Sequence, residues 1–139
     1  DVTCLLVQPT SDIVATDFDG DGKLEILTFS KFHGDTLAIW HEGQTRDRYE
    51  QIWCDPQKRS FLHALWAADL NGEKCAVIGN RKDGRDLLLV RYVDGEYTVD
   101  VIDHDLGPAN CMVYRHDGSD YIVAAYRETD QLALYKVVE

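Results

Sequence analysis

Basic residues and long apolar runs are scarce in this chain. Its 139 residues include 25 Asp and Glu but only 14 Lys and Arg, and the formal net charge is -11. The basic residues are scattered, whereas a nucleic-acid surface needs a basic stripe, so we expect no nucleic-acid partner. No apolar run approaches the length of a bilayer, and the first residues lack a signal-peptide pattern. We therefore expect no membrane span.

Sustained helical periodicity is also missing, so very little helix is expected. The length suits one ordinary domain. The four cysteines form no Cys-x-x-Cys pair, which argues against a zinc ribbon or a thioredoxin-type motif. Each lies among apolar residues, so buried free thiols are expected, with disulfides as the alternative. These cysteines are Cys4, Cys54, Cys75 and Cys111.

Four acidic residues are concentrated in the segment 17–25, Asp-Phe-Asp-Gly-Asp-Gly-Lys-Leu-Glu. Gly20 and Gly22 let the backbone curl so that the side-chain oxygens converge. Acids this close repel one another without a cation, and a flexible, oxygen-only cage favours calcium. The side chains that supply the oxygens are those of Asp17, Asp19, Asp21 and Glu25.

The flanks of this acidic segment distinguish it from an EF-hand. An EF-hand loop places its last acid at the twelfth position between two helices, whereas here the acid is at the ninth. Residues 12–16 and 26–29 are short and rich in β-branched and aromatic residues, which predicts a strand on each side. A hairpin turn made acidic for solubility remains the alternative.

An internal repeat organises the chain. Three apolar segments that each end in a basic residue align at 25–31, 75–81 and 121–127, and each is followed by a segment that opens with an aspartate. A shorter apolar segment precedes each unit, and another follows the first two. The pattern predicts an all-β fold of three four-stranded antiparallel meanders of the size of propeller blades. The expected blades span about 11–56, 63–104 and 110–138.

The third unit ends after its third strand, and residues 2–8 supply an unattached strand that matches the missing one. We expect this strand to complete the last blade, because a closed ring leaves no sheet edge unpaired. Propellers have about four to eight blades, so three are too few. Either the chain is a piece of a longer propeller, or a homodimer closes a six-bladed ring. The match between chain ends and blade ends favours the homodimer.

The strand, acidic motif and second strand together resemble the FG-GAP or VCBS repeats of integrin-like β-propellers, which occur in integrin α-subunit heads, fungal lectins and bacterial sugar-active proteins. The resemblance implies that Asp17, Asp19, Asp21 and Glu25 bind calcium through their side chains and Lys23 through its backbone carbonyl. It also implies carbohydrate or protein as a ligand and an extracellular location.

The corresponding loops of the other two units depart from this motif. The second is two residues shorter and has Cys75 in place of the last acid, and the third has Arg115 at the first ligand position. Neither is expected to hold calcium. We therefore expect one structural Ca2+ per chain, which neutralises the acids and fixes the turn.

Two residues of the second unit are candidates for a functional site. His63 precedes an innermost strand, near the mouth of the expected channel, where it is either an acid/base or metal-binding group or a packing residue. Residues 63–72 are also similar to the blade openings of propeller enzymes related to fungal aldos-2-ulose dehydratase. Trp66 is a candidate to stack on a sugar ring, whereas Trp40 and Trp53 are expected in the core. The histidines to which no role is assigned are His33, His41, His104 and His116.

A basic residue ends the second strand of each unit, and an aspartate follows the turn. These residues are expected to form ion pairs that hold each hairpin, or a polar rim that binds a sugar or an acidic ligand. The pairs are Lys31 with Asp35, Arg81 with Asp86, and Arg127 with Asp130.

Two functions stay open. The first is a calcium-stabilised binding module for carbohydrate or protein. The second is a sugar-processing lyase or dehydratase with His63 as the acid/base near the channel. The fold alone does not decide between them, because one propeller fold hosts unrelated activities.

Overall fold

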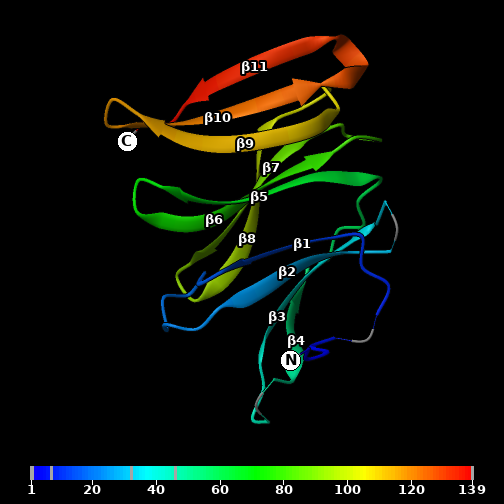
Figure 1. Cartoon of the computed structure of the whole chain (residues 1–139). Helices are drawn as coiled ribbons and strands as arrows, with labels where there is room; N and C mark the ends of the chain where they lie inside the picture. The colour runs from blue at the N-terminus through cyan, green and yellow to red at the C-terminus, as the bar shows by residue number, and fades with distance from the viewer. Residues whose placement is uncertain (1, 7, 32, 46, 139) are drawn as a thin grey trace.

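The computed structural model describes residues 2–6, 8–31, 33–45 and 47–138. Within these residues the chain forms three antiparallel sheets whose strands hydrogen-bond in chain order (Figure 1). The predicted all-β fold of antiparallel sheets is therefore confirmed. The first sheet contains β1 (Asp12–Thr16), β2 (Glu25–Ser30), β3 (Thr36–Glu42) and β4 (Tyr49–Cys54).

The other two sheets repeat this meander. The second has four strands, and the third has three strands with a short 3-10 helix, η1 (Arg127–Thr129), before its last strand. The second sheet contains β5 (Leu62–Leu70), β6 (Glu73–Asn80), β7 (Leu87–Val93) and β8 (Glu96–Asp103). The third contains β9 (Pro108–His116), β10 (Ser119–Tyr126) and β11 (Gln131–Lys136).

The sheets are stacked in chain order, with the second between the first and the third (Figure 1). Their first strands lie side by side, because β5 contacts both β1 and β9. Alternate residues of β6 enter two different cores, as strand alternation requires. Ala76 and Ile78 pack against the first sheet, whereas Cys75 and Val77 pack against the third. The middle sheet is therefore covered on both faces, which accounts for its nearly continuous apolar strands.

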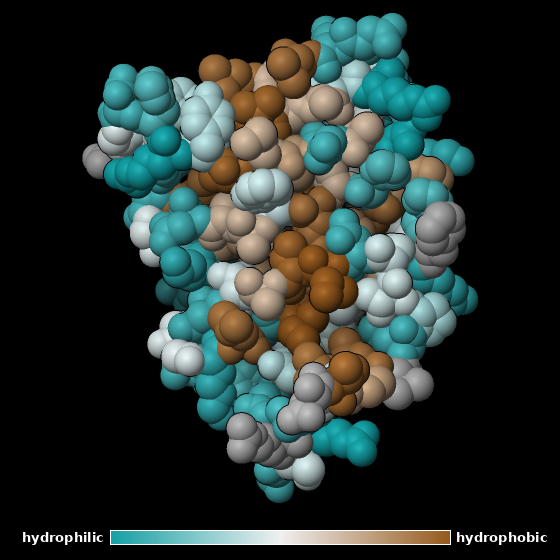
Figure 2. All heavy atoms as spheres, viewed as in Figure 1, coloured by the Kyte–Doolittle hydropathy of each residue, from teal (hydrophilic) through white to brown (hydrophobic). Residues whose placement is uncertain are grey.

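The third sheet has one buried face and one open face. Ile122 and Ala124 of β10 point into the core. On the opposite face, Val123 pairs with Met112 of β9 and Leu134 of β11, and these two side chains are 43% and 59% exposed. Figure 2 shows that hydrophobic side chains run in a band down one side of the molecule, flanked by hydrophilic ones.

The N-terminal residues do not behave as predicted in the single chain. Residues 2–6 form no strand, and Val7 of the predicted strand lies outside the described residues. Leu5 and Leu6 instead line a cleft with Trp40 and Tyr49 of the first sheet. The third sheet consequently has three strands among the described residues, with β11 at its edge.

Among the described residues, no helix is long and apolar enough to cross a membrane.

Candidate metal centre

The hairpin between β1 and β2 carries the acidic segment and buries its last acid. Glu25 is the first residue of β2, and its side chain is fully buried. The backbone amide of Phe18 donates a hydrogen bond of 2.7 Å to Oε2 of Glu25. The other oxygen, Oε1, is buried and has no hydrogen-bond partner among the described residues. A buried carboxylate oxygen without a donor is costly, so a cation at this position would offset a real penalty.

The charge on Glu25 is poorly supported by its surroundings. Burial raises the pKa of its carboxyl group above the ordinary value, and the nearby carboxylates of Asp19 and Asp17 raise it further. The Phe18 amide and His41 act in the opposite direction. This is the pattern expected of an acid whose counter-charge is missing.

The loop itself curls as the glycines predict. Gly20 and Gly22 have φ values of 76° and 87°, in the left-handed region that side chains disfavour. Their amides donate to the two oxygens of Asp17, at 2.8 and 3.1 Å. The ligand oxygens of Asp17, Asp19 and Asp21 lie within 4.8 Å of one another. The structure thus brings three predicted ligands together around one small volume.

The remaining predicted ligand, Lys23, closes the loop with its side chain exposed. Its amide donates to Oδ1 of Asp21 at 2.8 Å. Oδ2 of Asp21 faces Nε2 of His41 at 3.4 Å, and Oε1 of Glu25 lies 3.5 Å from the same nitrogen. Asp21 is therefore common to both acidic groups of the hairpin.

His41 is the residue that the sequence analysis missed. Ile26 of β2 pairs with Trp40 of β3, so the residue before Ile26 lies beside the residue after Trp40. That places Glu25 next to His41. The signal was available only through the register of the hairpin, since 16 positions separate the two residues in the chain.

The corresponding hairpins of the other sheets contain their own cations. Between β5 and β6, Nζ of Lys74 lies 2.7 Å from Oδ2 of Asp69. Between β9 and β10, Nη1 of Arg115 donates to both oxygens of the buried Asp120, at 3.1 and 3.2 Å. The first hairpin has no Lys or Arg ion pair among the described residues. It is thus the hairpin that needs an external cation.

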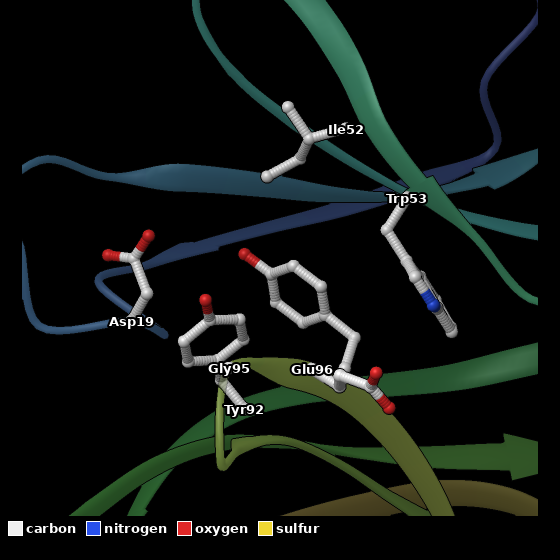
Figure 3. Close-up of a pocket in the computed structure, with 7 residues that line it drawn as sticks. Asp19, Ile52, Trp53, Tyr92, Gly95 and Glu96 are labelled. Carbon is white, nitrogen blue, oxygen red and sulfur yellow. The ribbon is translucent and has the colours of Figure 1, made fainter.

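A cleft of about 420 Å³ lies next to the acidic loop, between the first and second sheets. In Figure 3, Asp19 lies at one end of this cleft and Trp53 at the other. Tyr97 also lines it, and its buried hydroxyl has no hydrogen-bond partner among the described residues. Burial and the carboxylates of the loop raise the pKa of Tyr97. Trp53 packs against the core, as predicted.

Trp66 and His63 both lie on β5 but in different surroundings. Trp66 is 41% exposed and lines a cleft of about 560 Å³ with Tyr114 and Arg115 of β9. His63 is partly buried, and its Nδ1 lies 2.9 Å from the carbonyl oxygen of Ala109. Its ring stacks on those of His33 and Phe61, with centroids 5.5 and 5.8 Å away. His63 therefore connects the second sheet to the start of the third.

The predicted charged rim is not built from hairpin pairs. Arg81 binds Glu128 of η1 at 2.7 Å instead of Asp86, and its guanidinium lies 5.0 Å from the centre of the Phe61 ring. Asp35 pairs with Lys58 at 3.7 Å. Lys31 and Arg127 are exposed, and no ion pair joins them to Asp35 or Asp130 within the described part of the chain. The prediction of three hairpin pairs is wrong, because a contact between sheets competes for Arg81.

All four cysteines are free. Cys75 and Cys111 are buried, as predicted, whereas Cys4 and Cys54 are exposed. Burial raises the pKa of both buried thiols to about 12, and acidic neighbours add to the effect. Cys75 occupies the place of Glu25 in the second sheet, so a neutral side chain fills that position there.

The oxygens of the first hairpin fit a calcium ion by their chemistry. Carboxylates are the ligands that Ca2+ prefers, and a flexible loop suits its variable coordination. The orphaned Oε1 of Glu25 supplies a negative group that is already desolvated. No family model and no curated protein matches the chain.

Proposed function

We propose that the chain is a calcium-stabilised module of the integrin-like propeller type, which binds carbohydrate or protein. The observation that supports this most strongly is the buried Oε1 of Glu25, which faces the acidic loop without a donor. In this proposal one Ca2+ per chain is held by Asp17, Asp19, Asp21, Glu25 and the carbonyl of Lys23. The ion fixes the first hairpin and has a structural role.

The contrast with the other hairpins supports the same assignment. Lys74 and Arg115 neutralise the acids of the second and third hairpins. One external ion per chain is therefore the expected stoichiometry.

The proposal is tested by calorimetric titration of Ca2+ into the wild-type protein and into Glu25→Gln. The wild type should bind one equivalent, and the variant, which lacks the buried charge, should lose at least about tenfold in affinity. Asp117→Asn is the matched control, because Asp117 is an exposed acid in the third hairpin. Absence of Ca2+ binding to the wild type would overturn the proposal, as would equal loss in both variants.

The propeller assignment is supported by the side-by-side first strands and by the open apolar face of the third sheet. A sheet with one uncovered apolar face gains free energy when another sheet packs on it. We propose that a second copy covers it and closes a six-bladed ring, with residues 2–8 of each chain pairing with β11 of the other. In the alternative, further blades of a longer chain fill this place.

The cleft beside Trp66 is the candidate ligand site. An exposed indole next to Tyr114 and the guanidinium of Arg115 offers an apolar platform with polar groups at its edge, which suits a sugar ring. A glycan array with the wild type and Trp66→Ala tests this role. A glycan that binds both proteins equally would exclude Trp66 from the site.

A further inference from the structure

His41 points its free ring nitrogen at the two acids of the first hairpin that have the least support. Nδ1 of His41 lies 2.8 Å from the backbone carbonyl oxygen of Glu42. A carbonyl only accepts, so Nδ1 carries the proton and donates. In the neutral ring Nε2 then has a lone pair, and this lone pair is directed toward Asp21 and Glu25. A histidine fixed in this way by a backbone carbonyl is oriented as metal-binding histidines are.

The distances around Nε2 differ from those of hydrogen bonds. Nε2 lies 3.4 Å from Oδ2 of Asp21 and 3.5 Å from Oε1 of Glu25, and Oε1 remains without a hydrogen-bond partner. Two ligands at about 2.0–2.1 Å from one ion, at a tetrahedral angle, are about 3.4 Å apart. The three atoms therefore have the mutual spacing of atoms that share an ion.

The burial of the three groups is graded from the core to solvent. The Glu25 side chain is fully buried, that of His41 is 20% exposed and that of Asp21 is 42% exposed. An ion at this position would be held by Glu25 from below and would be reached from the solvent side past Asp21. The fully buried, unpartnered Glu25 oxygen is the observation that distinguishes this group from an ordinary cluster of surface acids.

We propose that Nε2 of His41 is a metal ligand, so that the first hairpin takes a first-row transition-metal dication through Asp21, Glu25 and His41 in addition to binding Ca2+. This inference rests on the proposed cation site but extends its chemistry. Imidazole nitrogen adds affinity for transition ions and almost none for Ca2+, which prefers oxygen. The two kinds of ion would compete, because both need Asp21 and Glu25.

Mn2+ is the most informative probe. It accepts carboxylate and imidazole ligands, and it avoids the exposed thiols of Cys4 and Cys54, which would bind softer ions. The test compares titrations of Mn2+ and Ca2+ into the wild type and into His41→Gln, whose amide has oxygen in place of the ring nitrogen. His116→Gln is the matched control, since His116 is an exposed histidine beside Asp117.

We expect His41→Gln to weaken Mn2+ binding at least about tenfold and to change Ca2+ binding less than about threefold. His116→Gln should change neither. Pulsed electron paramagnetic resonance of wild-type protein with one equivalent of Mn2+ should show the 14N coupling of a bound imidazole, and this readout does not depend on the folding of a variant.

Mn2+ bound without 14N coupling, or bound equally well by His41→Gln, would overturn the inference and leave the calcium proposal standing. Ca2+ that fails to bind while Mn2+ binds with 14N coupling would overturn the calcium proposal alone. If the wild type binds neither ion, both are wrong.

Discussion

Nη1 of Arg115 lies 3.1 Å from a carboxylate oxygen of Asp120, which is buried between the second and third sheets. The amide of Asn71 donates to the same carboxylate at 2.8 Å, so the third hairpin supplies this acid with a complete set of donors. Glu25 of the first hairpin has one donor and an orphaned oxygen. This difference between two related hairpins is the physical basis of the proposed ion site.

Removal of the Arg115 side chain should destabilise the protein. In Arg115→Leu the buried carboxylate of Asp120 loses its counter-charge, and we expect the free energy of unfolding to fall by about 1–3 kcal/mol. The value lies below that of a fully buried pair because the Arg115 side chain is 62% exposed. Urea denaturation measures it.

The matched control for Arg115→Leu is Lys74→Met. Lys74 forms an equally short ion pair with Asp69, but both side chains are about half exposed. Its loss should change the free energy of unfolding by less than about 1 kcal/mol. Equal effects of the two substitutions would show that burial of Asp120 does not matter.

Two thiols should react in the folded protein and four after unfolding. Cys4 and Cys54 are exposed, whereas burial protects Cys75 and Cys111. A colorimetric thiol assay at pH 8, with and without denaturant, counts them. Rapid reaction of all four in the native state would contradict the packing of β6 and β9.

The buried thiols also predict a loss of stability in alkali. The folded pKa of Cys75 and Cys111 is raised from 9.0 to about 12, so the unfolded chain releases these protons first. The stabilisation is complete below pH 9 and is lost as the pH rises from 9 toward 12. Denaturation midpoints across this range should fall less steeply for Cys111→Ala than for the wild type.

A charge on the open face of the third sheet should dissociate the proposed dimer. Leu134 is 59% exposed and is the cross-strand neighbour of Val123. We expect the wild type to have twice the mass of one chain by light scattering, and Leu134→Asp to have the mass of one chain. Val101→Asp on β8 is the control, since Val101 is similarly exposed, at 56%, on the last strand of the middle sheet. A monomeric wild type would exclude the two-chain ring.

His63→Ala tests a structural role against a catalytic one. The substitution removes the contact between Nδ1 and the Ala109 carbonyl, and we expect a loss of about 1 kcal/mol in stability with calcium binding unchanged. Phe61→Leu is a useful comparison, because it removes the ring on which His63 stacks without touching that hydrogen bond. A sugar-processing activity that disappears in His63→Ala at unchanged stability would favour the enzyme alternative.

The sequence was sufficient for the sheets because the relevant signals are local. Aspartates and glycines at turns, with apolar segments between them, predicted the strands from β1 to β11 in the right order. The ligand spacing of Asp17, Asp19 and Asp21 was equally local. Each of these features is decided within about ten residues along the chain.

Contacts between distant segments were not predictable in the same way. His41 joins the site only through the pairing of β2 with β3, and Arg81 finds Glu128 only because the second and third sheets pack together. The N-terminal segment was assigned to the third sheet by its apolar pattern, yet Leu5 and Leu6 line a cleft on the first sheet in the single chain. Side-chain periodicity predicts which residues seek cover but does not specify what covers them.

Thermal unfolding of the wild-type protein in a chelator and in saturating Ca2+ tests the central claim most directly. Ca2+ at about 100 times its dissociation constant should add about 2.7 kcal/mol, because it binds the folded hairpin and not the unfolded chain. For a chain of this size the midpoint should rise by about 6–10 °C. An identical midpoint in chelator and in Ca2+ would contradict the account.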